Sequence, residues 1–278
     1  MFKDTIIENA LAKVAKRLNI KACETVLFEN RHKHIDEINT ILRKIYHKNE
    51  IKIVDVGGGL GINLMVLREL LNDKKIELYL VDRFVEYNED NKMGSFENIK
   101  NLLLDYDIKI INQDIVKNNR LIFDDDEIDV VTILDVVEHL PTNPNFILKE
   151  IFRILKPGGT IILSGPNLFG ITEVLKFISG RHPYMDFNLW MQPQYFSHFR
   201  EYTKKEYEKI LLNSGFTSVK SSLRLSHFKT RFLYQYWKRK LKWYDYRNII
   251  LAMIFLFLII FPLFKPSVLC EGIKPIQK

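Results

Sequence analysis

The stretch IKIVDVGGGLG, residues 51–61, decides the fold that we expect for this chain of 278 residues. Its first six residues are mostly isoleucine and valine, which is typical of a buried strand. Four of the next five residues are glycines, and residues 62–71 then carry apolar side chains at helical spacing. A strand, a glycine-rich turn and a helix in this order indicate the first unit of a doubly wound α/β fold, whose glycines let a ligand approach the backbone.

The rest of the central region repeats this alternation of strands and helices. Helical spacing of apolar side chains separates the runs, for example in residues 146–155, and residues 4–18 and 34–47 resemble two further helices ahead of the first strand. Near-continuous apolar strands between helices indicate a parallel sheet that is covered on both faces. Further β-branched apolar runs occupy residues 76–82, 108–112, 128–135 and 160–165.

The glycine loop differs from two common nucleotide-binding motifs. The dinucleotide fingerprint GxGxxG needs glycine or alanine at the position of Ile62, and a P-loop would continue with Gly-Lys and Ser or Thr. The second strand ends in Asp82, 21 residues after Gly61. In doubly wound folds a carboxylate at this place accepts hydrogen bonds from a ribose diol. We favour that role for Asp82 over an exposed strand end, and Gln113-Asp114 after the third strand could contact an adenine edge.

Six motifs, spread over residues 54–216, carry a family resemblance. They are VDVGGGLG (54–61), Asp82, Gln113-Asp114, LDVVEHLP (134–141), LKPGG (155–159) and HFREYTKKEYEKILLNSGF (198–216). In this order they resemble the class I S-adenosylmethionine (SAM)-dependent methyltransferases, in particular the subgroup related to quinone-biosynthesis and glycan methyltransferases. Each motif alone is unspecific, but together they cover about residues 50–220.

The resemblance implies a fold, a cofactor and a set of binding residues. The fold is an α/β, Rossmann-like, doubly wound seven-stranded sheet of order 3-2-1-4-5-7-6 with helices on both faces. Its last two strands, expected at residues 217–225 and 267–274, run antiparallel. The cofactor is SAM. The cofactor-binding residues are Asp55, Gly57, Gly59 and Gly61 at the methionine end, Asp82 at the ribose, Asp114 at the adenine amino group, and Asp135.

Methyl transfer to a hydroxyl needs a general base, and the candidates follow the fourth strand. Asp135, Glu138 and His139 have the spacing i, i+3, i+4, which would place them on one face of a helical turn. They could brace that turn, provide His139 as a base, or hold a divalent cation, as an acidic-x-x-Glu-His pattern does in related methyltransferases. His198 is a second base, or else a packed histidine. Our catalytic candidates are His139, His198 and Asp135, and we assign no metal ligand.

The positive charge of the chain is local. The net charge is +7, and residues 200–247 hold 13 Lys or Arg against 4 Asp or Glu, a charge of +9 that leaves −2 for the rest. The next segment, residues 249–264, has sixteen residues without a polar side chain. As a helix it would be about 24 Å long, short of a hydrocarbon core of about 30 Å. We expect residues 226–265 to form an insertion that dips into one membrane leaflet, with a buried helix, a dimer interface or a short transmembrane anchor as alternatives.

Four parts result from this organisation. Residues 1–48 form N-terminal helices, residues 49–225 the SAM-binding core, residues 226–265 the membrane-associating insertion, and residues 266–278 the last strand and tail. Within the core, the aromatic-rich residues 166–197 form a lid over the pocket.

These patterns predict a SAM-dependent methyltransferase that O-methylates a lipid-linked sugar or another amphipathic acceptor at the membrane surface. A soluble metabolite, a quinone precursor, or a non-catalytic SAM-fold binding module are the alternatives. Residues 164–167 lack the Asn/Asp-Pro-Pro-aromatic signature of amino-methylating nucleic-acid enzymes, so we expect no nucleic-acid partner. Two cysteines and the absence of a signal-peptide pattern at the start indicate the cytoplasm, at the inner face of the membrane. The oligomeric state has no sequence signal.

Overall fold

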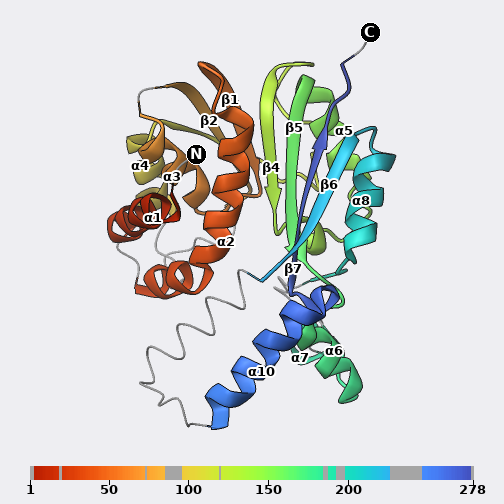
Figure 1. The fold of residues 1–278 in the computed structure, drawn as a ribbon. Coiled ribbons are helices and arrows are strands. Elements are labelled where there is room, and N and C mark those ends of the chain that lie inside the picture. Colours follow the sequence, from red (N-terminus) through yellow and green to blue (C-terminus); the bar gives the residue numbers. More distant parts are fainter. Residues whose placement is uncertain are drawn as a thin grey trace.

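Seven strands form one sheet in the order β3-β2-β1-β4-β5-β7-β6, as the resemblance implied (Figure 1). Strands β1 to β5 run parallel, and β7 runs antiparallel to both β5 and β6. The strands are β1 Glu50–Val56, β2 Lys75–Asp82, β3 Ile108–Asn112, β4 Ile128–Leu134, β5 Leu155–Pro166, β6 Thr217–Arg224 and β7 Ser267–Ile273. This computed structural model describes residues 3–18, 21–72, 74–84, 96–118, 120–183, 187–191, 198–225 and 246–276.

Helices cover both faces of the sheet, and two short 3₁₀ turns connect strands. The first four helices pack on one face, and α5 and α8 on the other (Figure 1). The helices are α1 Asp4–Leu18, α2 Lys21–Ile45, α3 Ile62–Leu70, α4 Phe96–Asp105, α5 Asn145–Ile154, α6 Ile171–Ile178, α7 Phe187–Trp190, α8 Lys204–Asn213 and α10 Tyr246–Ile260, with 3₁₀ turns η1 Val137–His139 and η2 Pro262–Phe264.

The apolar runs of the strands build two cores, one on each face. In β1, Ile51 and Ile53 belong to the core under α1 to α4, whereas Val54 and Val56 belong to the core under α5 and α8. Successive side chains of a strand point to opposite faces, so a strand that is buried on both faces must be apolar at nearly every position. This explains why the parallel strands read as continuous apolar runs.

Two elements begin well before their expected first residue, whereas the other predicted boundaries agree within two residues. Helix α2 begins at Lys21 rather than at residue 34. Its first half consists mostly of residues that favour a helix, but their apolar side chains lack clear helical spacing, so the apolar pattern did not indicate this part of the helix. Strand β5 begins at Leu155 rather than at residue 160. Its first residues, which include a proline and two glycines, pair with the chain after β7, since Gly158 N–H donates to the Lys274 carbonyl.

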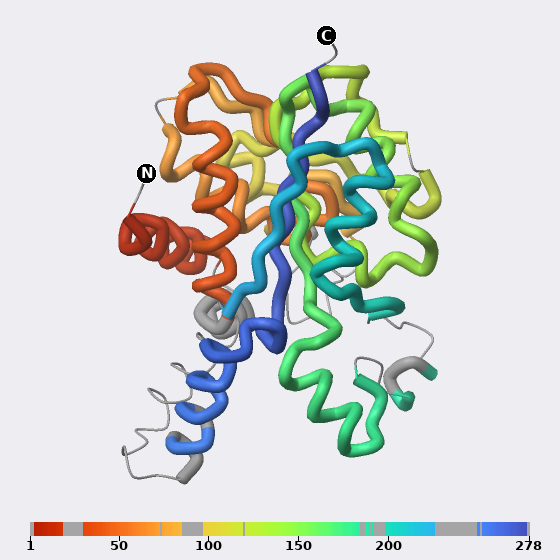
Figure 2. Tube along the Cα trace, turned by 45° about the vertical axis from the view of Figure 1, so that its right-hand side comes forward, coloured from red at the N-terminus to blue at the C-terminus, as the bar shows by residue number. Residues whose placement is uncertain are grey.

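Two helical projections leave the edge at which the parallel strands end. The first contains α6 and α7 and follows β5, and the second contains α10 and η2 and leads into β7 (Figures 1 and 2). They fall within the expected lid and the expected insertion, of which residues 184–186, 192–197 and 226–245 lie outside the described residues. Within the described ranges, no helix is both long and apolar enough to span a bilayer.

Candidate active site

A cavity of about 510 Å³ opens at the carboxyl ends of β1, β2, β3 and β4. This volume lies in the usual range for a small-molecule site, and this edge is where doubly wound sheets bind their ligands. The cavity is lined by six of the residues that we predicted from the sequence. They are Gly57, Gly59, Asp82, Asp114, Asp135 and His139. Three other predicted residues, Asp55, Gly61 and His198, are not among its lining residues.

The glycine loop needs glycine for two different reasons. Gly57, Gly59 and Gly61 all have left-handed backbone conformations, with φ values of 72°, 56° and 66°. A Cβ at Gly57 would lie 2.6 Å from a methyl group of Val136, beside the cavity. A Cβ at Gly61 would instead lie 2.7 Å from the Leu103 side chain, so this glycine permits α3 to pack closely. The loop therefore presents bare backbone to the cavity at Gly57 and Gly59, which fits a bound cofactor.

Asp55 lies beneath the loop. It is buried, and its Oδ1 accepts a hydrogen bond of 2.6 Å from the Thr132 hydroxyl. A Cβ at Gly58 would lie 2.2 Å from Asp55 Oδ2, so the loop sits directly on this carboxyl. Burial raises the pKa of Asp55 to about 7, although the bond from Thr132 acts in the opposite direction. The contacts of Asp55 support the loop from below, and its role at the methionine end of SAM stays a prediction.

Asp82 joins the loop to the end of β2. Its Oδ2 accepts from the Gly59 N–H and its Oδ1 from the Phe84 N–H, each at 2.9 Å. A carboxylate has about four acceptor positions, so each oxygen of Asp82 keeps one for a ligand. Because Asp82 also lines the cavity, the two hydroxyls of a ribose could donate to it there.

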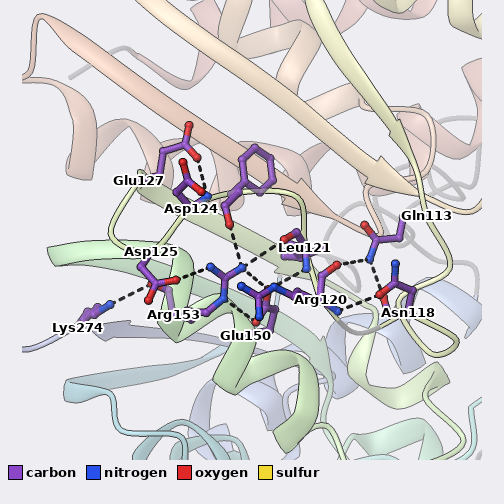
Figure 3. A network of polar contacts seen from close by, with 11 residues as sticks. Gln113, Asn118, Arg120, Leu121, Asp124, Asp125, Glu127, Glu150, Arg153 and Lys274 are labelled. Carbon is purple, nitrogen blue, oxygen red and sulfur yellow. Dashed lines mark hydrogen bonds and ion pairs between the residues drawn. The ribbon is translucent and has the colours of Figure 1, made fainter.

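Gln113 and Asp114 follow β3, and both line the cavity. Asp114 Oδ1 caps its own turn by accepting from the Val116 N–H at 3.0 Å, while its Oδ2 lies 4.0 Å from Lys117 Nζ. The amide of Gln113 donates to the carbonyls of Asn118 and Arg120 (Figure 3). Gln113 therefore holds the loop after β3.

The same loop is tied to α5 by Arg153. Its guanidinium donates to Glu150 and Asp125 and to the carbonyls of Leu121 and Phe123 (Figure 3). These carboxylates raise the pKa of Arg153. The network fixes the chain beyond Asp114, on the side of the cavity that we assign to the adenine.

Two histidines and two buried carboxylates gather at the other end of the cavity. The rings of His139 and His198 meet edge to face, with centroids 4.8 Å apart. His198 Nδ1 lies 2.7 Å from Glu201 Oε1. The Glu138 carbonyl accepts from the Phe199 N–H at 2.7 Å, which joins η1 to the segment that carries His198. Residues distant in the sequence thus form one cluster, defined as Glu138, His139, His198 and Glu201 and called here the histidine cluster.

Asp135 does not belong to the histidine cluster. It has a left-handed φ of 53°, and the 3₁₀ turn begins only at Val137, so the expected common helical face with Glu138 and His139 does not form. Asp135 instead forms an ion pair with Lys33 of α2. It still lines the cavity, where its role in cofactor binding stays a prediction.

Glu138 and Glu201 each have one oxygen without a partner among the described residues. Both side chains are buried, and the oxygens are Glu138 Oε2 and Glu201 Oε2. Burial raises the pKa of Glu138 to about 7. A buried polar atom of this kind is rare in folded proteins, and here it points to a ligand, a proton or a water at the histidine cluster.

A cation could also bind at the histidine cluster. Glu138, His139 and His198 each offer a ligand atom, and these atoms lie within 4.8 Å of one another. Glu201 would then orient His198 as a carboxylate behind a metal-bound imidazole. Two nitrogens and one carboxylate oxygen suit zinc or manganese better than magnesium. These histidines could therefore act either as a general base or as ligands of a cation.

We expect the protein variant Glu138→Gln to gain stability relative to the wild type as the pH rises. Between the usual glutamate pKa of 4.5 and the folded value of about 7, the folded state keeps a proton that the unfolded state has lost. The carboxyl therefore lowers the free energy of unfolding through this window, by about 3 kcal/mol in total. The side-chain amide of the glutamine variant cannot ionise, so the variant does not lose this stability as the pH rises. Chemical denaturation of both proteins from about pH 4 to pH 8 measures the difference.

The exposed glutamate Glu97 of α4 provides the control. Its replacement by glutamine should leave the stability difference from the wild type nearly independent of pH. A difference for Glu138→Gln that does not change with pH would contradict the raised pKa.

Two residues of the site had escaped the sequence reasoning. Lys33 comes from α2, and no local pattern connects it with Asp135. Glu201 stands three residues after His198, and this i, i+3 spacing was the signal that could have identified it.

Comparison with known proteins identifies the family. Residues 28–221 match the methyltransferase-domain family. No curated protein sequence matches the chain significantly.

Solved structures show the same fold at low sequence identity. Haemonchus contortus phosphoethanolamine N-methyltransferase 2 in complex with SAM is 15% identical, with a TM-score of 0.54 over 86% of this chain and 52% of the nematode one. The present chain therefore spans about half the length of that enzyme. A chain from the complex of the Haloferax volcanii Trm112 methyltransferase activator with a methyltransferase is 18% identical, with a TM-score of 0.54 over 99% of this chain and 100% of that one.

An Archaeoglobus fulgidus SAM-dependent methyltransferase is 20% identical, with a TM-score of 0.51 over 90% of this chain and 99% of that one. These likenesses establish the fold, and the family match covers more than half of the sequence. The glycine backbone and the carboxylates of the cavity fit the cofactor of that family. The chain therefore belongs to the methyltransferase-domain family.

Proposed function

We propose that this enzyme O-methylates a lipid-linked sugar or another amphipathic acceptor at the cytoplasmic face of a membrane. The observation that carries the O-methylation is the pair of His198 and Glu201 beside the cavity. A hydroxyl is a weak nucleophile that must lose its proton during transfer, and a histidine oriented by a carboxylate is suited to take that proton.

SAM, when bound, supplies a methyl group that the positive sulfonium has already activated. Gly57, Gly59, Asp82 and Asp114 would hold it, because they line the cavity with bare backbone and carboxylates. The remaining task of the protein is to align the acceptor oxygen with this methyl group, and such positioning supplies much of the rate.

The proton of the acceptor passes to His198. With Nδ1 directed to Glu201 Oε1, the proton of the neutral ring resides on Nδ1 and Nε2 can accept. Glu201 then stabilises the positive charge that develops on the ring. Glu201 is buried, so its attraction for this charge is weakly screened by solvent. His139 contacts the same ring edge to face and completes the acceptor side of the site.

The amphipathic acceptor is supported by an exposed apolar surface at the edge of the sheet where the cavity opens (Figure 1). On α10 and η2, side chains such as Met253, Leu256, Ile260 and Leu263 are exposed. Adjoining residues 200–247 carry the charge of +9 that an anionic membrane surface attracts. A soluble metabolite would need neither feature.

Two measurements test the proposal. Calorimetric titration with SAM should give saturable binding, and the absence of binding at millimolar cofactor would contradict the enzyme assignment. A transfer screen with methyl-labelled SAM should label a component of a lipid extract through an oxygen, and not a panel of purified water-soluble glycans and metabolites. Labelling of soluble acceptors alone would contradict the proposed acceptor. Labelling of a nitrogen or carbon atom would contradict the proposed O-methylation.

A further inference from the structure

The two projections share one root, which is built around Asn167. This residue is buried directly after β5. Its side-chain amide donates to the carbonyls of Leu263 and Lys265, at 2.9 and 2.8 Å, and its own N–H donates to the Pro266 carbonyl at 2.8 Å. The start of the α6 projection is thus bound to the end of the α10 projection, and the two are positioned relative to each other.

Helix α6 exposes an apolar surface that the fold does not use. None of its eight residues, all of which the structure describes, is buried. Leu175, Phe177 and Ile178 are 51%, 72% and 74% exposed. A helix on a water-soluble surface normally buries its apolar stripe against the core. The apolar side chains of α6 therefore do not pack against the sheet and can contact a partner outside the fold.

Helix α10 exposes a broad apolar face. Of the α10 side chains that the structure describes, only Leu258 is buried. The exposed side chains Ile249, Met253, Leu256 and Ile260 lie on one helical face, which exposed Ile250 and Ile259 widen on its two sides. A broad apolar face without charged side chains suits the interfacial region of a membrane. The positive charge of the segment before α10 favours anionic lipid over a second copy of this chain, because like-charged copies repel each other.

Both projections leave the sheet at the edge where the cavity opens (Figures 1 and 2). Residues 226–247, which lead directly into α10, carry seven Lys or Arg and one Asp. Basic residues next to an apolar segment suit an anionic lipid surface, at which each contributes about 1 kcal/mol. Charge, apolar exposure and position thus point to the same partner.

We propose that α6, α10 and η2 form one two-part docking surface for a bilayer with anionic phospholipids, and that the acceptor passes from the lipid to the cavity beside this surface. The inference rests on the proposed membrane-surface function and adds α6 as a second contact, within a segment that we predicted to be a lid. Asn167 holds the two contacts so that both can meet the same membrane.

Vesicle flotation of the full-length protein tests this inference, with phosphatidylcholine vesicles that do or do not contain phosphatidylglycerol. The wild type should bind the anionic vesicles more tightly. The double variants Phe177→Ser/Ile178→Ser in α6 and Met253→Ser/Ile260→Ser in α10 should each partition at least about tenfold more weakly. Ile122→Ser is the matched control because Ile122 is 71% exposed and lies in the loop that contacts Lys274, at the opposite edge of the sheet.

The outcomes separate this inference from the function on which it rests. Weak binding of the α10 variant with normal binding of the α6 variant would overturn the role of α6 and leave the membrane function standing. No binding of the wild type to either vesicle would contradict both. SAM titration should be unchanged in both double variants, so a loss there would reveal misfolding. A wild-type dimer that the α6 substitutions dissociate would identify a second copy as the occupant and overturn the proposal.

Discussion

Replacing His198 by glutamine should lower the rate of methyl transfer by about 10²–10⁴ while SAM affinity stays nearly unchanged. Glutamine can still donate a hydrogen bond to Glu201, but it cannot take a proton from the acceptor. The cofactor residues lie at the other end of the cavity, and His198 is not among its lining residues. Single-turnover transfer with labelled SAM, combined with calorimetric titration, separates the chemical step from cofactor binding.

Two companion variants refine this expectation. Glu201→Gln should give a smaller loss than His198→Gln, because the base is still present but its positive form is less stabilised. His139→Gln should lose less than His198→Gln, because Glu201 orients His198 and not His139. A full loss in His139→Gln with an active His198→Gln would assign the base to His139 instead.

A chelator distinguishes the base from a cation at the histidine cluster. The base mechanism predicts that exhaustive treatment with EDTA leaves the transfer rate unchanged. Loss of activity that a divalent cation restores would show that Glu138, His139 and His198 serve as ligands.

Replacing Asp82 by alanine should weaken SAM binding by about 10- to 100-fold. The substitution removes the acceptor of two ribose hydroxyls and also the acceptor of the Gly59 and Phe84 N–H groups. A hydrogen bond to a charged group contributes about 1.5–3 kcal/mol, so the loss of even one of those to the ribose corresponds to a change of this size. Calorimetric titration with SAM, and with S-adenosylhomocysteine, gives the affinities directly.

Controls must separate the loss of the ribose contacts from the loss of the hydrogen bonds that Asp82 accepts from the Gly59 and Phe84 N–H groups. Asp82→Asn keeps one acceptor oxygen and should lie between the wild type and the alanine variant. Asp105→Ala changes an exposed aspartate on α4 that pairs with Arg17, and should leave SAM affinity unchanged. An unaltered affinity in Asp82→Ala would remove the ribose assignment.

The first βα unit could be predicted because its signals are local. Residues 51–61 contain both the strand and the turn, and each of Gly57, Gly59 and Gly61 does have a positive φ. The strand order is a different matter. The position of β7 between β5 and β6 depends on pairing between residues more than forty positions apart, as for Ser222 and Leu269, and only the family resemblance supplied it.

The candidate site was predictable where it follows strand ends, and less so elsewhere. Asp82 and Asp114 line the cavity because the carboxyl ends of parallel strands meet at one edge. Asp135 was placed with Glu138 by assuming a helical turn, but its left-handed backbone turns it toward Lys33. That contact depends on how α2 packs over the sheet, which no short-range spacing encodes.

The antiparallel strand β7 has a consequence for the order of assembly during synthesis. β7 is the last of the seven strands in the sequence, yet it fills the position between β5 and β6. While a ribosome is still making α10, β5 therefore has an unpaired edge and the sheet is incomplete. The apolar helix α10 therefore leaves the ribosome before the strand that completes the sheet.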